Sequence, residues 1–313
     1  MAPVPGIQSA LHPQGPQAEA IATLSWVLIA GAAAILLVVL ALAAYAVYGP
    51  DKRRAWVARE RFIVGAGIVF PIVALTALLV YTLLLEASIA GRDGFPAARI
   101  AVTGHQWWWR VHYLDATGGV DFVTANEIRI PAGRPVELTL ESADVIHSFA
   151  VPNLAGKLDM IPGRINRLTL QAHAPGVFRG QCLEYCGGPH AKMAFYVIAE
   201  SPENFERWRE GQRTPALAAE DAPVERGRAL FMSHCIACYT VRGTVARGTL
   251  GPDLTHVGSR SSLAAGILPN NAGTLASWIS ASQDLKPGNL MPSMNIFSGD
   301  DLRALAAYLE SLK

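Results

Sequence analysis

Charged residues are scarce in this sequence. Asp, Glu, Lys and Arg make up 16% of its 313 residues, against about a quarter in typical soluble domains. The two signs nearly cancel, which leaves a formal net charge of +1. This balance argues against a nucleic-acid-binding protein and against a disordered chain. Cysteine is also rare, because four cysteines are too few to staple a chain of this length as a disulfide scaffold.

The four cysteines form two close pairs, Cys182 with Cys186 and Cys235 with Cys238. Such spacing is typical of metal or cofactor sites. The length and the uneven composition predict two or three structural units rather than one.

Charge is absent from two long apolar stretches, 21–48 and 62–85. About 20 apolar residues suffice to cross a bilayer as a helix, so both are predicted to form a transmembrane hairpin within the segment 1–96. A cleaved signal peptide is the alternative for the first stretch, but residues 1–20 lack Lys and Arg and the apolar run is too long. Pro71 in the second stretch is tolerated where neighbouring helices satisfy the backbone, which hints at a larger membrane complex.

The connection between the two stretches is strongly basic and holds Lys52, Arg53, Arg54, Arg59 and Arg61. Positive residues favour the cytoplasmic side of a membrane. We therefore expect a multi-pass membrane protein whose connection lies in the cytoplasm and whose two chain ends lie on the other side of the membrane.

Residues 97–200 have the pattern of an all-β sandwich or barrel. Alternating or β-branched runs occur between Gly and Pro turns, and they predict strands at 99–114, 126–131, 135–141 and 167–171.

This β segment contains His147 and then a run with Cys182, Cys186, His190 and Met193. Thiolates and a thioether beside imidazoles select copper over magnesium or calcium. A mononuclear blue-copper site needs one thiolate, so the second cysteine suggests a dinuclear centre. The alternative is a disulfide between Cys182 and Cys186, with His190 and Met193 as ordinary residues.

Four motifs, in order, resemble subunit II of the haem-copper cytochrome c oxidases over about residues 20–210. They are Gly104-His-Gln-Trp-Trp-Trp109, Asp144-Val-Ile-His-Ser-Phe-Ala-Val-Pro152, Asp159-Met-Ile-Pro-Gly-Arg-Ile-Asn166 and Gly180-Gln-Cys-Leu-Glu-Tyr-Cys-Gly187. The resemblance implies a cupredoxin-like fold and the dinuclear copper A centre. The ligands it implies are His147, Cys182, Cys186, His190, Met193 and the backbone carbonyl of Glu184.

The resemblance also implies roles beside the copper. Trp107 resembles the residue through which electrons reach the copper, although Trp107 to Trp109 also fit a strand at a membrane interface. The carboxylate of Glu184 resembles one that contacts a magnesium ion shared with the catalytic subunit; the alternative is a solvated carboxylate. The family often has a proton-channel Glu near the start of the second helix. The nearest acid here is Glu60, to which no role is assigned.

After a linker at 201–223, residues 224–313 resemble a class I cytochrome c fused to subunit II, as in caa3-type oxidases. Helices are predicted at 225–235, at 274–282 and after a cap at Ser298, so this unit is all-α. The matching motifs are Cys235-Ile-Ala-Cys238, Gly251-Pro-Asp-Leu-Thr-His256 and Lys286-Pro-Gly-Asn-Leu-Met-Pro292.

The covalent haem motif Cys-x-x-Cys-His is incomplete, because Tyr239 stands where the family has histidine. Cys235, Cys238 and Met291 would hold haem c, with Met294 as a rival to Met291. Three interpretations stay open: Tyr239 ligates haem as a phenolate, His234 or His256 replaces the missing imidazole, or the domain has lost haem.

The resemblance implies the electron-accepting subunit of a proton-translocating cytochrome c oxidase. Electrons from reduced cytochrome c would pass through the copper to a catalytic subunit I that reduces oxygen, within a complex of further subunits and lipid. The alternatives are a copper A-bearing nitric oxide reductase subunit and a membrane-tethered copper carrier or assembly protein. A quinol oxidase subunit is disfavoured because no copper ligand is missing.

Overall fold

The computed structural model describes residues 6–50, 55–90, 95–216 and 221–313. Its internal contacts divide the chain into two compact units, one of Gln17–Gly94 and one of Met1–Pro16 with Phe95–Lys313. Three of the basic residues expected to set the membrane orientation, Lys52, Arg53 and Arg54, lie outside the described residues.

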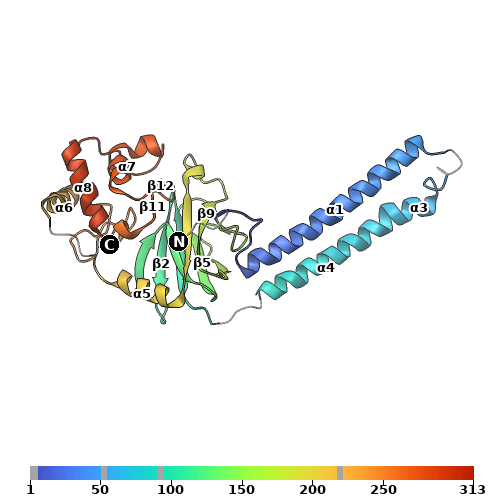
Figure 1. Ribbon diagram of the computed structural model, residues 1–313, viewed down its shortest axis with the longest axis horizontal. Helices are drawn as coiled ribbons and strands as arrows, with labels where there is room; N and C mark the ends of the chain where they lie inside the picture. The colour runs from blue at the N-terminus through green and yellow to red at the C-terminus, as the bar shows by residue number, and fades with distance from the viewer. Residues whose placement is uncertain (1–5, 51–54, 91–94, 217–220) are drawn as a thin grey trace. The chain divides into compact units, whose positions relative to one another are not determined.

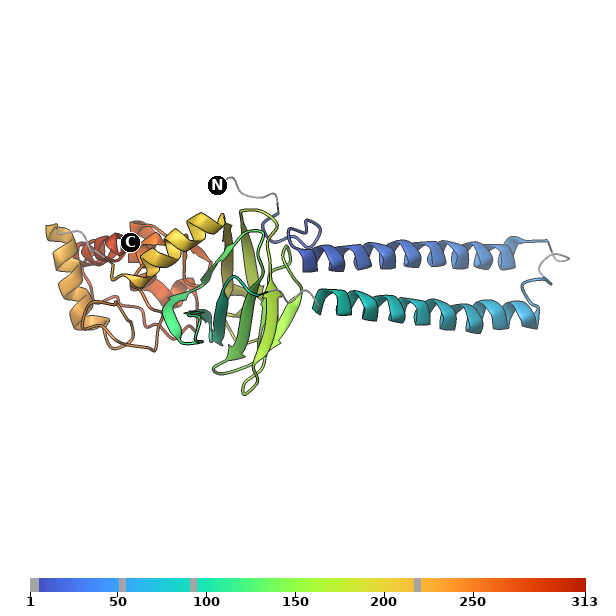
Figure 2. The same ribbon diagram turned by 90° about the horizontal axis from the view of Figure 1, so that it is seen from below.

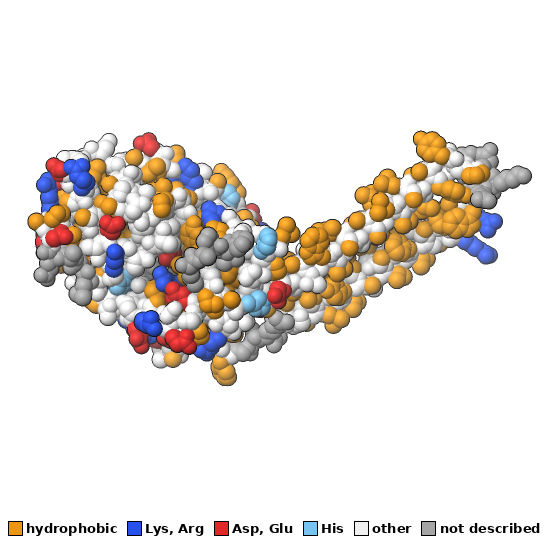
Figure 3. All heavy atoms as spheres, in the orientation of Figure 1, with side chains coloured by type: hydrophobic (Ala, Val, Ile, Leu, Met, Phe, Trp, Pro, Cys, Tyr) orange, Lys and Arg blue, Asp and Glu red, His pale blue; other side chains and the backbone are white. Residues whose placement is uncertain are grey.

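The smaller unit is built from two long helical segments. The first is α1 (Pro16–Tyr48); the second comprises α3 (Glu60–Val64), a π-helical turn η1 (Gly65–Val69) and α4 (Phe70–Ala90). Figures 1 and 2 show α1 and α4 running side by side. Both segments are long and apolar enough to cross a membrane. Their apolar side chains face outward (Figure 3), as a bilayer rather than water would favour, which confirms the predicted helical hairpin.

The π-helical turn lies immediately before Pro71 in the chain. Proline has no backbone N–H to donate within the helix, and widened turns of this kind relieve such breaks. The helix therefore continues through Pro71 instead of ending there.

The β domain is a sandwich of two five-stranded sheets, as predicted. The first sheet has the order β3 (Val120–Ala125), β2 (Trp108–Leu114), β1 (Arg99–His105), β5 (Val136–Ser142), β8 (Asn166–Leu170). The second has the order β4 (Glu127–Pro131), β10 (Ala194–Glu200), β9 (Gly176–Cys182), β6 (His147–Ala150), β7 (Lys157–Met160). Alternate side chains of β2, β5 and β9 are buried between the sheets.

The prediction of a single strand at 99–114 is wrong. These residues form two strands, β1 and β2, which pair antiparallel with His105 opposite Trp108. The turn between them consists of Gln106 and Trp107. It contains neither the Gly nor the Asn that usually marks such a turn in a sequence.

The linker expected at 201–223 begins with a helix, α5 (Pro202–Arg213). The Ser201 side chain caps it by accepting from the Asn204 amide, and Phe205 is buried against the sandwich. Asp121 of β3 accepts hydrogen bonds from Arg213 and Arg209. This part of the predicted linker is therefore packed on the β domain.

The C-terminal domain is helical, as predicted, with α6 (Ala222–His234), α7 (Ala272–Leu285) and α8 (Gly299–Ser311) as its main helices. A short 3₁₀ turn η3 (Val257–Ser259) and a two-stranded ribbon of β11 (Ser262–Leu263) and β12 (Leu268–Pro269) join α6 to α7. Helices α6 and α8 touch at Gly227, where an added Cβ would lie 2.0 Å from the carbonyl oxygen of Ala304. The expected cap at Ser298 is present, because its side chain accepts from the Asp301 amide.

Candidate metal centre

Two adjacent strands of the second sheet bring the first ligand candidates together. His147 is the first residue of β6, and Cys182 is the last residue of β9. These strands pair with Phe149 opposite Cys182. Neighbouring strands lie about 5 Å apart, so the side chains of His147 and Cys182 meet at one end of the sandwich.

The loop 183–193 folds back over this end of the sheet. The Cys182 amide donates to the Met193 carbonyl at 2.9 Å, and the Met193 amide donates to the His190 carbonyl at 3.1 Å. This closure returns Cys186, His190 and Met193 to the strand end that carries Cys182.

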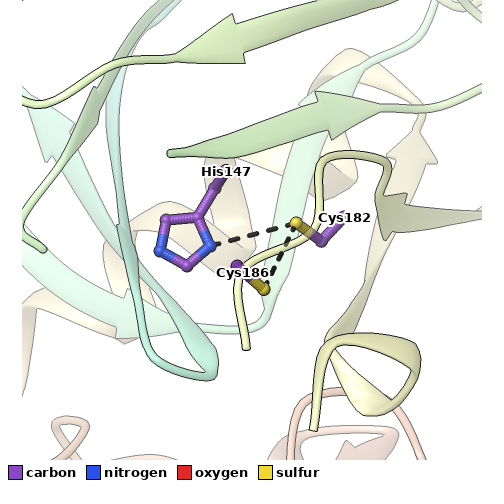
Figure 4. Close-up of side chains that lie close together, drawn as sticks. All are labelled: His147, Cys182 and Cys186. Carbon is purple, nitrogen blue, oxygen red and sulfur yellow. Dashed lines mark hydrogen bonds between the residues drawn. The ribbon is translucent and has the colours of Figure 1, made fainter. Parts of the chain in front are cut away.

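The structure brings together all five predicted ligand side chains. The sulfur of Cys182 lies 3.9 Å from Nδ1 of His147 and 3.8 Å from the sulfur of Cys186 (Figure 4). The Cys186 sulfur lies 3.4 Å from Nδ1 of His190 and 3.8 Å from Sδ of Met193. Both thiols are free, and a disulfide would need about 2 Å between the sulfurs. The structure thus contradicts the alternative of a Cys182–Cys186 disulfide.

The backbone carbonyl and the side-chain carboxylate of Glu184 face different surroundings. The backbone carbonyl accepts from the Cys182 thiol at 3.2 Å, so this oxygen faces the cluster. The carboxylate is 44% exposed and lies 3.4 Å from Nζ of Lys157. A magnesium ion would have to displace this lysine and take most of its ligands from elsewhere.

The cluster is buried, and its hydrogen bonds set the protonation of the thiols. The sulfurs of Cys182 and Cys186 share a hydrogen bond, and this bond is the largest cause that lowers the pKa of Cys182. The same bond and burial raise the pKa of Cys186. Burial alone would lower the pKa of His147, but its hydrogen bonds to Cys182 and Asp144 outweigh this and raise it. Binding of a metal ion to these sulfurs would release their thiol protons.

Two residues that sequence reasoning did not assign hold the imidazole of His147. Asp144 Oδ1 lies 2.7 Å from Nε2, on the opposite side of the ring from Cys182. Gly104 lies against the ring face, where a Cβ would be 2.9 Å from Cδ2. Both residues stand in the quoted motifs, but only the fold shows that they touch His147.

Trp107 is tied to the cluster through its indole. Its Nε1 donates to the Cys186 carbonyl at 2.9 Å, and the side-chain amide Nε2 of Gln106 donates to the same oxygen at 2.8 Å. The ring packs on Gly187, where a Cβ would lie 2.9 Å from Cζ2. A hydrogen bond thus links the indole directly to the residue that carries one sulfur of the cluster.

In the C-terminal domain, Cys235, Tyr239 and Met291 line one apolar cluster, together with the rival Met294. Both cysteines are free thiols, and burial raises the pKa of Cys235 to about 11. The Tyr239 ring lies against Gly251, where a Cβ would be 2.5 Å from Cε1, and burial raises the pKa of its phenol. A protonated phenol is a poor iron ligand, so these residues fit covalent attachment but not the usual His/Met ligation.

Both histidines offered as replacements for the missing imidazole have backbone hydrogen-bond partners of their own. His234 is exposed, and its Nδ1 lies 3.1 Å from the Leu230 carbonyl of its own helix. His256 is buried, and its Nε2 lies 3.0 Å from the Thr214 carbonyl. These hydrogen bonds favour neither His234 nor His256 as the replacement for the missing imidazole.

Family models match both soluble parts of the chain. Residues 118–200 match the model of the cytochrome c oxidase subunit II periplasmic domain, and residues 224–313 match the cytochrome c model.

Curated relatives match over most of the chain. Cytochrome c oxidase subunit 2 of Alkalihalophilus pseudofirmus is 40% identical over 252 residues, which cover 78% of this chain and 71% of the relative. The Bacillus subtilis protein of the same name is 28% identical, covering 81% of this chain and 75% of the relative. Among solved structures, the periplasmic domain of subunit II of cytochrome oxidase from Bradyrhizobium japonicum is 31% identical, with a TM-score of 0.36, over 38% of this chain and 96% of that structure.

Three observations agree: the 40% identity over two thirds or more of both chains, the two family models and the geometry of the cluster. The expectations of a multi-domain membrane subunit with a sulfur-rich copper site and a fused cytochrome c domain are confirmed. The chain belongs to the family of subunit II of cytochrome c oxidase, in the form that carries a C-terminal cytochrome c domain.

Proposed function

We propose that the cluster of His147, Cys182, Cys186, His190 and Met193, with the Glu184 carbonyl, binds two copper ions and receives the electrons that enter the oxidase. The observation that supports this most is the position of the Cys182 and Cys186 sulfurs, 3.8 Å apart and unbonded, between two imidazoles. The two thiolates, the two imidazoles and the thioether would hold the ions between them.

Bound copper supplies reversible one-electron exchange, and thiolate and imidazole ligands suit it. The residues of the chain keep the energy needed to rearrange the site during that exchange small. The cluster lies at one end of the sandwich, on the inner strands β6 and β9, and Met193 and Cys182 are fully buried. Because the ligands can move little, the site would need little rearrangement when its charge changes.

We propose Trp107 as the residue through which electrons reach the cluster, since its indole is hydrogen-bonded to the Cys186 carbonyl. The donor would be reduced cytochrome c. The acceptor would be the catalytic subunit of a haem-copper oxidase, which reduces oxygen on its own chain. The subunit would lie in a bacterial cytoplasmic membrane, with α1 and α4 as its spans and both soluble domains in the periplasm.

The domain division proposed here follows the sequence: 1–96 for the membrane segment, 97–200 for the copper domain, 201–223 for the connection and 224–313 for the cytochrome c domain. In the last domain, Cys235 and Cys238 would attach haem c and Met291 would face its iron. No step is assigned to that haem, because Tyr239 does not provide the usual imidazole. A magnesium ion at Glu184 belongs to the same proposal and needs ligands from the catalytic subunit.

Rapid mixing of the purified oxidase with reduced cytochrome c tests this function. The near-infrared absorption of the mixed-valence copper pair should bleach before oxygen consumption begins. The C186S variant should lose both this absorption and turnover with cytochrome c. C235S removes a thiol of the same chain outside the cluster and should keep the copper absorption; its loss in C235S, or normal turnover in C186S, would contradict the proposal.

A further inference from the structure

Lys286 is a buried cation at the boundary between the C-terminal domain and the copper domain. It follows α7 directly, and its side chain is 3% exposed. Its Nζ donates to the Trp107 carbonyl at 2.7 Å and to the Ala264 carbonyl at 3.1 Å. One acceptor belongs to each domain, so a single ammonium group bridges them.

Burying the ammonium group of Lys286 is energetically unfavourable. None of the ion pairs between described residues involves Lys286, and its ammonium group has only carbonyl partners, so burial lowers its pKa to about 7. A buried ammonium group without a carboxylate is unfavourable unless its hydrogen bonds are well placed. An aliphatic side chain would fill the space without this penalty. The lysine is therefore best explained by the contact that its Nζ makes.

Further contacts surround the bridge and define one interface. Nζ of Lys192 donates to the Leu285 carbonyl at 2.7 Å, and the Ala194 amide donates to the Ala265 carbonyl at 2.9 Å. At another part of the interface, buried Glu127 accepts from the Ser261 amide at 2.5 Å. The Ala194 and Ser261 amides are thus protected only while the two domains are in contact.

The bridge also connects two functional segments. On one side, Trp107 is bonded to the Cys186 carbonyl. On the other side, the Asn289 side chain donates to the Lys286 carbonyl at 2.8 Å and accepts from the Met291 amide at 2.7 Å. Covalent and hydrogen bonds therefore run without a gap from the Met291 segment to Cys186, and Lys286 is the link that crosses the interface.

We propose that Lys286 is a positioning residue that seats the C-terminal domain on Trp107, so that a separate donor protein meets the C-terminal domain before it can reach Trp107. The proposal rests on the proposed function of the copper cluster. It assigns Lys286 no contact with copper and no electron of its own. Its effect is on access: the seated domain covers the side of Trp107 that a soluble donor would approach.

The test uses the purified oxidase in a C235S/C238S background. This background removes covalent haem from the C-terminal domain, so soluble reduced cytochrome c can reduce the copper only directly. Adding K286M should raise the second-order rate constant for copper reduction by about tenfold, because loss of the charged group's hydrogen bonds shifts the population toward the open form. Hydrogen exchange at the Ala194 and Ser261 amides should rise with it. K286R, which keeps a donor cation, should restore much of the protection.

R228M is the matched control, because it removes an exposed cation of the same domain that pairs with Glu225 away from the interface. It should change neither the rate constant nor the exchange. E127Q weakens a separate contact of the same interface and should open the interface as K286M does. This variant replaces K286M in the test if the K286M oxidase fails to assemble. An unchanged rate constant and unchanged exchange in both interface variants would overturn the proposal. Loss of the near-infrared absorption in the background itself would instead count against the copper function, and amide exchange would still decide the role of Lys286.

Discussion

The imidazole of His147 is held between a thiol and a carboxylate: Nδ1 lies 3.9 Å from the Cys182 sulfur, and Nε2 lies 2.7 Å from Asp144 Oδ1. When Nδ1 binds a metal, Nε2 must carry the ring proton and donate it to Asp144. Such a partner fixes the tautomer and orientation of the ring and strengthens the nitrogen as a ligand. Asp144 is therefore part of the centre although it would not touch copper.

Replacing Asp144 with Asn should weaken copper binding. The amide can still accept a hydrogen bond, but it lacks the charge that supports the imidazole as a donor. We expect copper affinity to fall by about tenfold to a hundredfold, measured by competition with a chelator. D115N changes a partly exposed aspartate in the β2–β3 turn of the same domain, outside the cluster, and should bind copper like the wild type. Equal affinity in D144N and D115N would show that Asp144 does not support His147.

An alanine at Gly104 should disturb the same ring by contact alone. Its Cβ would lie 2.9 Å from Cδ2 of His147, closer than such atoms normally approach, and the buried ring has little room to retreat. G104A should lower copper affinity and change the absorption spectrum of the centre. G188A is the control, because a Cβ at Gly188 meets nothing within 4 Å although the residue lies in the ligand loop. A normal spectrum in G104A would mean that the ring position is not critical.

The attachment of α5 should depend on pH. Its hydrogen bond with Arg213 is the main cause that lowers the pKa of Asp121 below its usual value. The stabilisation is therefore fully present above the unfolded pKa of about 3.9 and is lost as the pH falls through the lower folded value. D121N should reduce the free energy of unfolding by about 1 kcal/mol at pH 7.

Thermal unfolding of the purified subunit at several pH values measures this effect. The gap between the melting temperatures of wild type and D121N should be constant from about pH 5 to 8 and should narrow below about pH 4. D300N removes an exposed ion pair with Arg303 on α8 and should leave the melting temperature nearly unchanged. A gap that does not vary with pH would contradict the role given to the Asp121 carboxylate.

Restoring histidine at position 239 should complete a haem site. Cys235 and Met291 already line the same apolar cluster, Cys238 is a free thiol three residues from Cys235, and imidazole is smaller than the phenol that now packs on Gly251. Y239H should carry covalent haem, visible as peroxidase activity on a denaturing gel and as added intact mass. Its spectrum should be that of a low-spin haem with His/Met ligands and a higher potential than any haem held beside Tyr239. Absence of covalent haem in Y239H would show that the domain has lost the cofactor for reasons other than Tyr239.

Much of the fold could be predicted because its signals are local. Charge-free runs of sufficient length indicated α1 and α4, and the cap at Ser298 indicated α8. The division of 99–114 into β1 and β2 was missed because Gln106 and Trp107 carry no turn signal. Helix α5 was missed because its polar composition resembles a linker. Its packing rests on the burial of Phe205 and on the hydrogen bonds of Arg209 and Arg213 with Asp121, which composition does not reveal.

The ligand residues could also be predicted, since their chemistry and spacing are visible in the chain. Their neighbours could not. Asp144 is only three residues from His147, but the sequence does not show that its carboxylate faces the ring. Gly104 and Lys286 act through contacts between strands or domains, and Lys286 and Trp107 are 179 residues apart. Only the three-dimensional structure brings such pairs together.

The most direct test of the account is the copper content of the purified oxidase, measured by elemental analysis and electron paramagnetic resonance on wild type and C182S/C186S. We predict that the wild type holds two copper ions in this subunit that share one unpaired electron, and that the double variant lacks both. A single copper ion with a mononuclear spectrum, or a mass two hydrogens lighter that reveals a bond between Cys182 and Cys186, would contradict the proposed centre.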